Sequence, residues 1–160
     1  MSEDPTGRVR QAASALGLSI ELVERPAAGS LAEAAALLGL EPDDIVKTLV
    51  VSRSDGTFLF ALVPGDRAIS WPKLRAVVGV NKLHLPDADR ALAATGYERG
   101  TITPFGSTRA WPVVADERVP GRPASIGGGA HGVSATVDGD DLVRALAATV
   151  ADVTDPEPPR

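Results

Sequence analysis

The sequence has no cysteine, two histidines and no long apolar run in its 160 residues. Without cysteine the chain has no disulfides, no thiolate ligands and no thiol nucleophile. His84 and His131 lack a metal-ligand spacing, which argues against a metalloenzyme, and we expect no metal and no other cofactor. No stretch reaches the roughly eighteen apolar residues of a membrane span. The acidic N-terminus, Met1–Pro5, lacks the apolar core of a secretory signal, so we expect a cytoplasmic protein.

The length suits one domain with a substantial core. A share of 44% apolar and 23% charged residues is typical of a soluble globular protein. We expect residues 1–152 to form a single domain. The Pro-rich, charged residues 153–160 lack the apolar side chains of a packed segment, and we expect a disordered tail there.

The formal net charge is -5, but the charges are unevenly distributed. Residues 1–46 hold three Arg and eight acidic residues, and residues 123–160 hold two Arg and six. The middle, 47–122, holds eleven Lys or Arg and seven acidic residues. This basic centre could form a phosphate-binding surface, or its charges could be scattered and solvated. The candidate cations are Arg53, Lys73, Arg75, Lys82, Arg99 and Arg109.

Short helical and strand patterns are mixed along the chain, which predicts an α+β fold. Ser30 and Glu33 match a capping box at the start of one helix. We expect a compact, mixed or barrel-like β-sheet surrounded by short helices. The predicted helices cover 6–16, 31–38, 70–78, 87–96 and 140–150, and the predicted strands cover 18–23, 43–51, 57–63, 81–85, 111–115 and 133–137.

Lys47 is a charged residue in a strand pattern that is otherwise mainly apolar. Side chains alternate along a strand, so Lys47 shares a face with Ile45, Leu49 and Val51. One interpretation is an edge-strand lysine that reaches water and discourages aggregation. The other is a lysine that lines a polar pocket in an apolar sheet, where its ammonium needs a partner. The strand alone leaves both open.

Two glycine-rich stretches are expected in loops between strands. The first runs from Gly100 to Gly106 in a G-x-x-x-P-x-G pattern, and its amides could bind a carbonyl or oxyanion. The second, Gly127–Gly132, matches neither a Rossmann nor a Walker pattern. It precedes a predicted strand, which indicates backbone crowding near a pocket. Either loop could instead be an ordinary turn, and His131 could contact a ligand or be a turn residue.

Several of these motifs, in this order, resemble the YbaK/EbsC family, the free-standing relatives of the prolyl-tRNA synthetase editing domain. The resemblance covers roughly residues 8–152. The matching segments are Ser30–Ala35, Val46–Leu49, Val63–Arg67, Thr95–Tyr97, Gly100–Gly106, Gly127–Gly132 and Asp140–Val143.

The resemblance implies a trans-editing enzyme that hydrolyses the ester of mischarged aminoacyl-tRNA. The expected substrate is tRNA(Pro) carrying a small wrong amino acid such as Cys or Ala, with prolyl-tRNA synthetase as a further partner. It implies catalytic roles for the lysine of the strand and for the loop glycines, here Lys47, Gly100 and Gly106. We expect substrate contacts from Thr48, Thr103, Pro104, Phe105, Gly128, Gly129 and His131.

An aminoacyl ester is already activated, so its hydrolysis needs positioning and oxyanion stabilisation more than a protein nucleophile. Two features depart from the family: Val23–Arg25 replaces an aromatic or His, and Ala130–His131 replaces two basic residues. Both could alter the amino-acid pocket, so the amino acid that is removed stays open. Two other functions also stay open: a non-catalytic module that binds tRNA or a synthetase, and a hydrolase of another small acyl ester.

Overall fold

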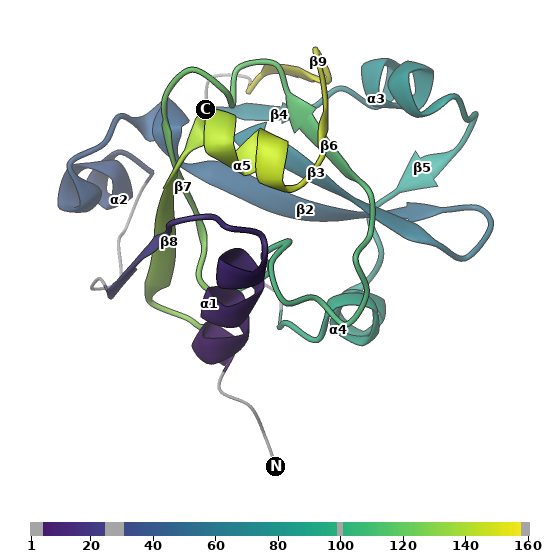
Figure 1. The fold of residues 1–160 in the computed structure, drawn as a ribbon. Helices are drawn as coiled ribbons and strands as arrows, with labels where there is room; N and C mark the ends of the chain where they lie inside the picture. Colours follow the sequence, from purple (N-terminus) through teal and green to yellow (C-terminus); the bar gives the residue numbers. More distant parts are fainter. Residues whose placement is uncertain (1–4, 25–30, 99–100, 158–160) are drawn as a thin grey trace.

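The structure is a computed structural model that describes residues 5–24, 31–98 and 101–157. Short helices and several sheets alternate along the chain, which confirms the predicted α+β class (Figure 1). The helices are α1 (Pro5–Ala15), α2 (Leu31–Leu38), the 3-10 turn η1 (Pro42–Asp44), α3 (Trp71–Val78), α4 (Ala88–Thr95) and α5 (Gly139–Ala145). The strands are β1 (Glu21–Glu24), β2 (Val46–Arg53), β3 (Phe58–Pro64), β4 (Arg67–Ile69), β5 (Leu83–His84), β6 (Val113–Asp116), β7 (Pro123–Gly127), β8 (Val133–Asp138), β9 (Thr149–Ala151) and β10 (Thr154–Pro156).

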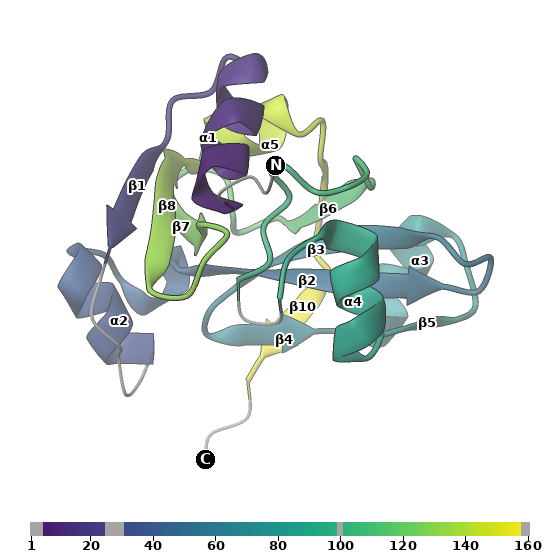
Figure 2. The same cartoon turned by 90° about the horizontal axis from the view of Figure 1, so that it is seen from below.

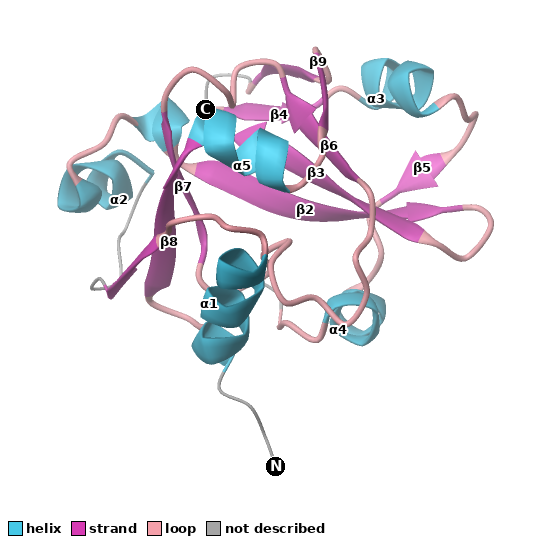
Figure 3. Ribbon diagram, in the orientation of Figure 1, coloured by secondary structure: helices cyan, strands magenta, loops and turns pink. Residues whose placement is uncertain are grey.

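The central sheet has five strands in the order β5-β2-β3-β6-β9 (Figure 3). β2 and β3 form an antiparallel hairpin in which Lys47 lies opposite Val63. Its turn is closed by Asp55, whose carboxylate accepts hydrogen bonds from the backbone and hydroxyl of Thr57. β6 runs parallel to β3, and β9 runs parallel to β6. The predicted 57–63 hairpin strand is therefore confirmed.

β3 is buried on both faces because two apolar clusters use its alternate residues. Phe60 and Leu62 belong to a larger cluster with α1, α5 and the sheet β1-β8-β7. Leu59 and Val63 belong to a smaller cluster with α3 and Val153. Figure 2 shows α1 and α5 on one side of the central sheet and the β4–β10 pair on the other. The central sheet is thus the middle layer of the domain.

Two of the predicted helices begin at a side chain that caps them. The Ser70 hydroxyl accepts a hydrogen bond from the amide of Lys73 at the start of α3. The Asp87 carboxylate accepts one from the amide of Arg90 at the start of α4. Ser30, the first residue of the predicted capping box, lies outside the described residues.

The end of the chain differs from the prediction. α5 ends at Ala145 instead of continuing to 150, and Ala147 has a positive φ of 50° that turns the chain away. Thr149–Ala151 then pairs with β6 as β9. Residues 154–156, expected in a disordered tail, form β10 against β4, and Thr154 is fully buried. Val153 of this tail packs into the smaller apolar cluster, and residues 154–156 pair with β4, which explains why they form a strand.

Candidate active site

A cavity of about 640 Å³ lies along β2. This volume is in the range of small-molecule sites in proteins. The walls combine strand β2, the β7–β8 hairpin, the start of α4 and single residues from α2 and the 101–106 loop. The lining residues are Leu38, Ile45–Val50, Leu85, Pro86, Ala88, Ala91, Ile102, Ser125–Gly127 and Ala130–Ser134.

The cavity borders β2 where this strand pairs on one side only. β5 pairs with Ser52 and Arg53 but has two residues, so it does not extend along Lys47–Val50. An isolated bridge from Ile45 to Ser125 links β2 to the β7–β8 hairpin. Residues 46–50, which lie between these two contacts, line the cavity.

Lys47 lines the cavity, as the pocket interpretation of its strand requires. Its ammonium donates a hydrogen bond of 2.7 Å to the backbone carbonyl of Arg67. It also forms an ion pair of 3.2 Å with the carboxylate of Glu157. The side chain is about one-third exposed, at 34%. The ammonium therefore has two acceptors and a third N–H left to donate.

Thr48, next to Lys47, also lines the cavity. Its hydroxyl oxygen is buried and has no hydrogen-bond partner, one of two such side-chain atoms in the described parts of the chain. A buried hydroxyl without a partner is costly in free energy. A group on a bound ligand could supply the missing partner.

The 100–106 loop contributes to the cavity through Ile102. Gly100, one of the predicted catalytic glycines, lies outside the described residues. Thr103, Pro104 and Phe105, predicted to contact substrate, are buried and are absent from the cavity lining. Phe105 packs in the larger apolar cluster. A direct contact of these three residues with substrate stays a prediction.

Gly106 is held at the far end of this loop by Arg8 and Tyr97. The Arg8 guanidinium donates to the Gly106 carbonyl at 2.5 Å and lies over the Tyr97 ring, 4.6 Å from its centroid. The Tyr97 hydroxyl donates to the Phe105 carbonyl at 2.5 Å. Burial raises the pKa of Tyr97, and the nearby Arg8 charge acts in the opposite direction. Arg8 was not singled out from the sequence, because its partners lie about ninety residues away.

The Gly127–Gly132 loop connects β7 to β8 and closes one wall of the cavity. Gly127, Gly132 and His131 line it. Gly127 lets the backbones meet, because a Cβ there would lie 2.6 Å from the carbonyl oxygen of Ile102. This is the backbone crowding near a pocket that the glycines predicted. The His131 side chain is exposed, with Nε2 3.6 Å from the Glu98 carboxylate.

Gly128 and Gly129, the other two predicted contacts in this loop, are buried beside protein atoms. Gly128 lies against Val133 and donates its amide to the Val133 carbonyl. Gly129 lies against the backbone of Pro5 and the side chain of Val9. Neither residue lines the cavity. Their contact with substrate stays a prediction.

The predicted basic surface is only partly available. Lys73 is paired with Asp152 and Asp155 at 3.0 Å each, and Arg109 stacks on the Trp111 ring. Arg99 lies outside the described residues. Lys82 and Arg53 flank a shallow hollow near the β2–β3 turn.

The model of the family described as "Aminoacyl-tRNA editing domain" matches residues 25–145. The chain belongs to this family. A proline--tRNA ligase of Trichlorobacter lovleyi is 36% identical over 97 residues, which cover 61% of this chain and 17% of that ligase. A proline--tRNA ligase of Moorella thermoacetica is 36% identical over 98 residues, again 17% of its length. The chain thus spans about a sixth of the curated relatives it matches.

Two solved structures share the fold over nearly the whole chain. One is "a putative trans-editing enzyme for prolyl tRNA synthetase", with a TM-score of 0.87, 26% identity, and coverage of 97% of this chain and 99% of the other. Another is the hypothetical protein APE2540, with a TM-score of 0.84, 30% identity, and coverage of 92% and 99%. The editing-domain fold expected from the sequence motifs is therefore confirmed.

Other classes of site are not apparent in the described residues. No group of three or more His, Asp or Glu lies close enough together there to hold a metal ion. No described helix is long and apolar enough to cross a bilayer.

Proposed function

We propose that this chain is a trans-editing hydrolase that deacylates mischarged aminoacyl-tRNA. Its substrate is tRNA(Pro) carrying a small non-cognate amino acid of the Cys or Ala type. The observation that carries the proposal is a cavity in an editing-domain fold that Lys47 lines, with an ammonium able to donate once more. The relatives among proline--tRNA ligases support the choice of tRNA.

Hydrolysis proceeds by attack of water on the ester carbonyl carbon. The carbonyl oxygen gains negative charge, and the bond to the ribose oxygen then breaks. The proton lost by the attacking water ends on the ribose oxygen, so the products are the free amino acid and the ribose hydroxyl of the tRNA. The Lys47 ammonium stabilises the negative charge on the carbonyl oxygen or on the neighbouring phosphate. Thr48 lies on the opposite face of β2 from Lys47, and its buried hydroxyl donates to a different part of the bound substrate.

The cavity selects the amino acid by size. Ile45, Val50, Ala91 and Ile126 supply apolar lining beside Lys47. A small side chain fits such a wall, whereas a larger one needs the wall to move. A difference of one methylene between two amino acids changes the ratio of their kcat/KM values only about 10- to 200-fold. The tRNA or a synthetase therefore contributes the remaining selectivity.

The test is deacylation of Cys-, Ala-, Ser- and Pro-tRNA(Pro) by the wild-type chain and by Lys47→Ala. We expect turnover of one small misacylated species and a loss of about 100-fold or more with Lys47→Ala, as for other transition-state donors. Arg10→Ala is the control, because Arg10 is exposed on α1 and lies outside both the cavity lining and the candidate basic surface. Its turnover should equal that of the wild type.

Other results would favour other functions. Binding of tRNA or synthetase without turnover of any species would indicate a binding module. Turnover of simple acyl esters with affinity independent of salt would indicate an esterase, because phosphate contacts give a steep dependence of affinity on salt concentration.

A further inference from the structure

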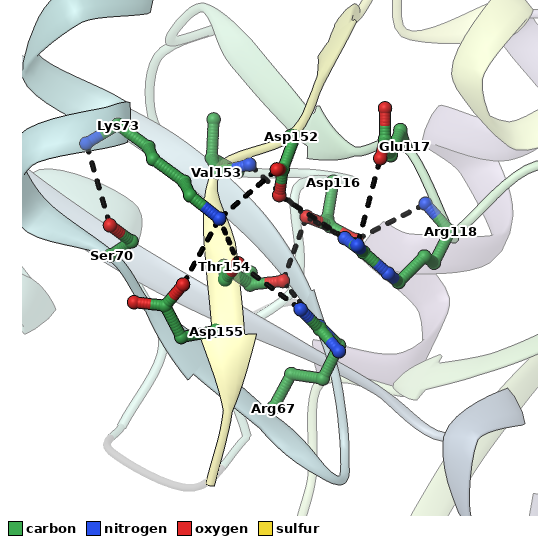
Figure 4. A network of polar contacts seen from close by, with 10 residues as sticks. All are labelled: Arg67, Ser70, Lys73, Asp116, Glu117, Arg118, Asp152, Val153, Thr154 and Asp155. Carbon is green, nitrogen blue, oxygen red and sulfur yellow. Dashed lines mark hydrogen bonds and ion pairs between the residues drawn. The ribbon is translucent and has the colours of Figure 1, made fainter.

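Asp116, at the end of β6, is a fully buried carboxylate that the proposed mechanism does not use. It accepts hydrogen bonds from the Thr154 hydroxyl at 2.8 Å and the Val153 amide at 3.2 Å. It also accepts from the backbone and guanidinium of Arg118 (Figure 4). A buried charge needs such partners, so Asp116 fixes the chain at 153–154.

Thr154 connects this buried carboxylate to Arg67. Its hydroxyl donates to Asp116 and accepts from Nε of Arg67 at 2.7 Å. The Arg67 guanidinium also donates to the Thr154 carbonyl at 3.2 Å. Lys73 adds bonds to the same carbonyl and to the carboxylates of Asp152 and Asp155. Figure 4 shows these side chains converging on β10.

The same strand pair supplies both acceptors of the Lys47 ammonium. The Arg67 carbonyl is one acceptor, and Arg67 lies opposite Pro156 in the β4–β10 pair. Glu157 is the other, and its own amide donates to the Asp66 carbonyl at 3.2 Å. Asp116 is thus bonded to Thr154 and Thr154 to the Arg67 guanidinium, while the backbone carbonyl of the same Arg67 accepts from Lys47.

We propose that the C-terminal segment Asp152–Glu157 positions Lys47 for the reaction, with Thr154 as the positioning residue and Glu157 as a second support. The inference rests on the proposed function of Lys47. The segment lies beyond residues 25–145, the part matched by the family model. Two fixed acceptors orient the ammonium and leave its third N–H for the substrate.

Positioning explains the geometry better than competition between Glu157 and the substrate. The shorter contact of Lys47 is with a neutral carbonyl in a strand pair, which does not compete as an anion. The Glu157 side chain is 44% exposed, and such exposed ion pairs are weak. Glu157 therefore cannot hold the ammonium away from a substrate phosphate.

The test compares Thr154→Val, which keeps the shape but removes the hydroxyl, with Thr154→Ser, which keeps the hydroxyl. Thr154→Val removes the two charge-assisted hydrogen bonds of the Thr154 hydroxyl, and only part of that change reaches Lys47 through Arg67. We therefore expect kcat to fall about 3- to 10-fold with KM little changed. Thr154→Ser should retain most of the wild-type kcat. In a Lys47→Ala background, Thr154→Val should cause no further loss, because Thr154 acts through Lys47.

A second variant keeps the test decisive if Thr154→Val does not fold. Glu157→Gln changes a half-exposed side chain and should lower kcat about 2- to 5-fold, again only when Lys47 is present.

Three results would overturn the inference. The first is a wild-type kcat in both Thr154→Val and Glu157→Gln. The second is an equal loss of kcat with and without Lys47, and the third is a rise in turnover on Glu157→Gln. If Lys47→Ala itself retains full deacylation activity, the proposed role of Lys47 fails and this inference fails with it, whereas absence of turnover by the wild-type chain overturns the proposed function.

Discussion

Lys47 illustrates how a single side chain can be charged and still belong to a mainly apolar strand. Its neighbours Leu49 and Val51 on the same face pack against the smaller apolar cluster. Its ammonium instead meets a carbonyl and a carboxylate, which offset the hydration it loses. The strand pattern left open a pocket or a sheet edge for Lys47. In the structure Lys47 lines the cavity and lies where β2 is paired on one side only. Its partner Glu157 could not be predicted, because nothing local links residues 110 positions apart.

Gly106 should be one of the least replaceable residues of the 101–106 loop, although it does not line the cavity and its catalytic role stays a prediction. It has a φ of +72°, and a Cβ there would lie 2.6 Å from the Tyr97 hydroxyl and 2.9 Å from the Arg8 carbonyl. We expect Gly106→Ala to lower the free energy of unfolding by about 2–4 kcal/mol, from backbone strain and crowding together. Urea unfolding measures this loss.

Gly56→Ala is the matched control for this substitution. Gly56 has a φ of +85°, but nothing lies within 4 Å of an added Cβ. Its loss of stability should come from backbone strain alone, about 1 kcal/mol. Equal losses in the two variants would contradict the close packing around Gly106.

Helices and strands that are defined by neighbouring residues could be predicted from the sequence, whereas strands that depend on pairing with distant segments could not. The hairpin β2–β3 and the capped helices α3 and α4 were predictable, because turn and cap residues lie next to the segments they define. β4, β7, β9 and β10 were not predicted. They are three to five residues long and are strands because distant segments pair with them. A strand of three to five residues is too short to show a clear alternation of apolar and polar residues in the sequence.

The β10 segment should make stability sensitive to acid. Hydrogen bonds from Lys73, then from Arg118, hold the pKa of Asp152 below its ordinary value of 3.8. A carboxylate with a lower pKa in the folded state contributes stability above its unfolded pKa. That contribution is lost as pH falls through the folded pKa. We expect the urea midpoint to fall below about pH 4, and to fall less in Asp152→Asn.

Asp89→Asn is the control for this pH dependence. Asp89 lies in the first turn of α4, outside the network around β10. Its variant should show the same acid sensitivity as the wild type. If Asp152→Asn also retains the full sensitivity, the ion pairs of Lys73 and Arg118 contribute no pH-dependent stability.

At the scale of the whole molecule, β3 joins the two apolar clusters. Because one strand supplies residues to both, neither cluster can open without disturbing the other. The domain is therefore expected to unfold in a single transition. The sequence indicated this strand through its continuous apolar run, but not the two layers that cover it, since those include the unpredicted β4, β7 and β10.

Leu62→Ala tests this arrangement. Leu62 is fully buried, and we expect a loss of about 2–5 kcal/mol with one transition seen by both fluorescence and circular dichroism. Leu92→Ala, at a position that is 44% exposed, should cost much less. Two separate transitions in the Leu62 variant would mean that the clusters are independent.

The parts of the protein that line the cavity differ in how strongly a substitution would destabilise the fold. One wall, strand β2, is paired with β3, which is buried on both faces. A substitution in β2 would therefore disturb the core. The other walls of the cavity include Leu38, Ala130 and Val133, which are not fully buried and lie on separate elements. Substitutions at these other walls can therefore change the shape of the cavity without a matching loss of stability, whereas substitutions in β2 cannot.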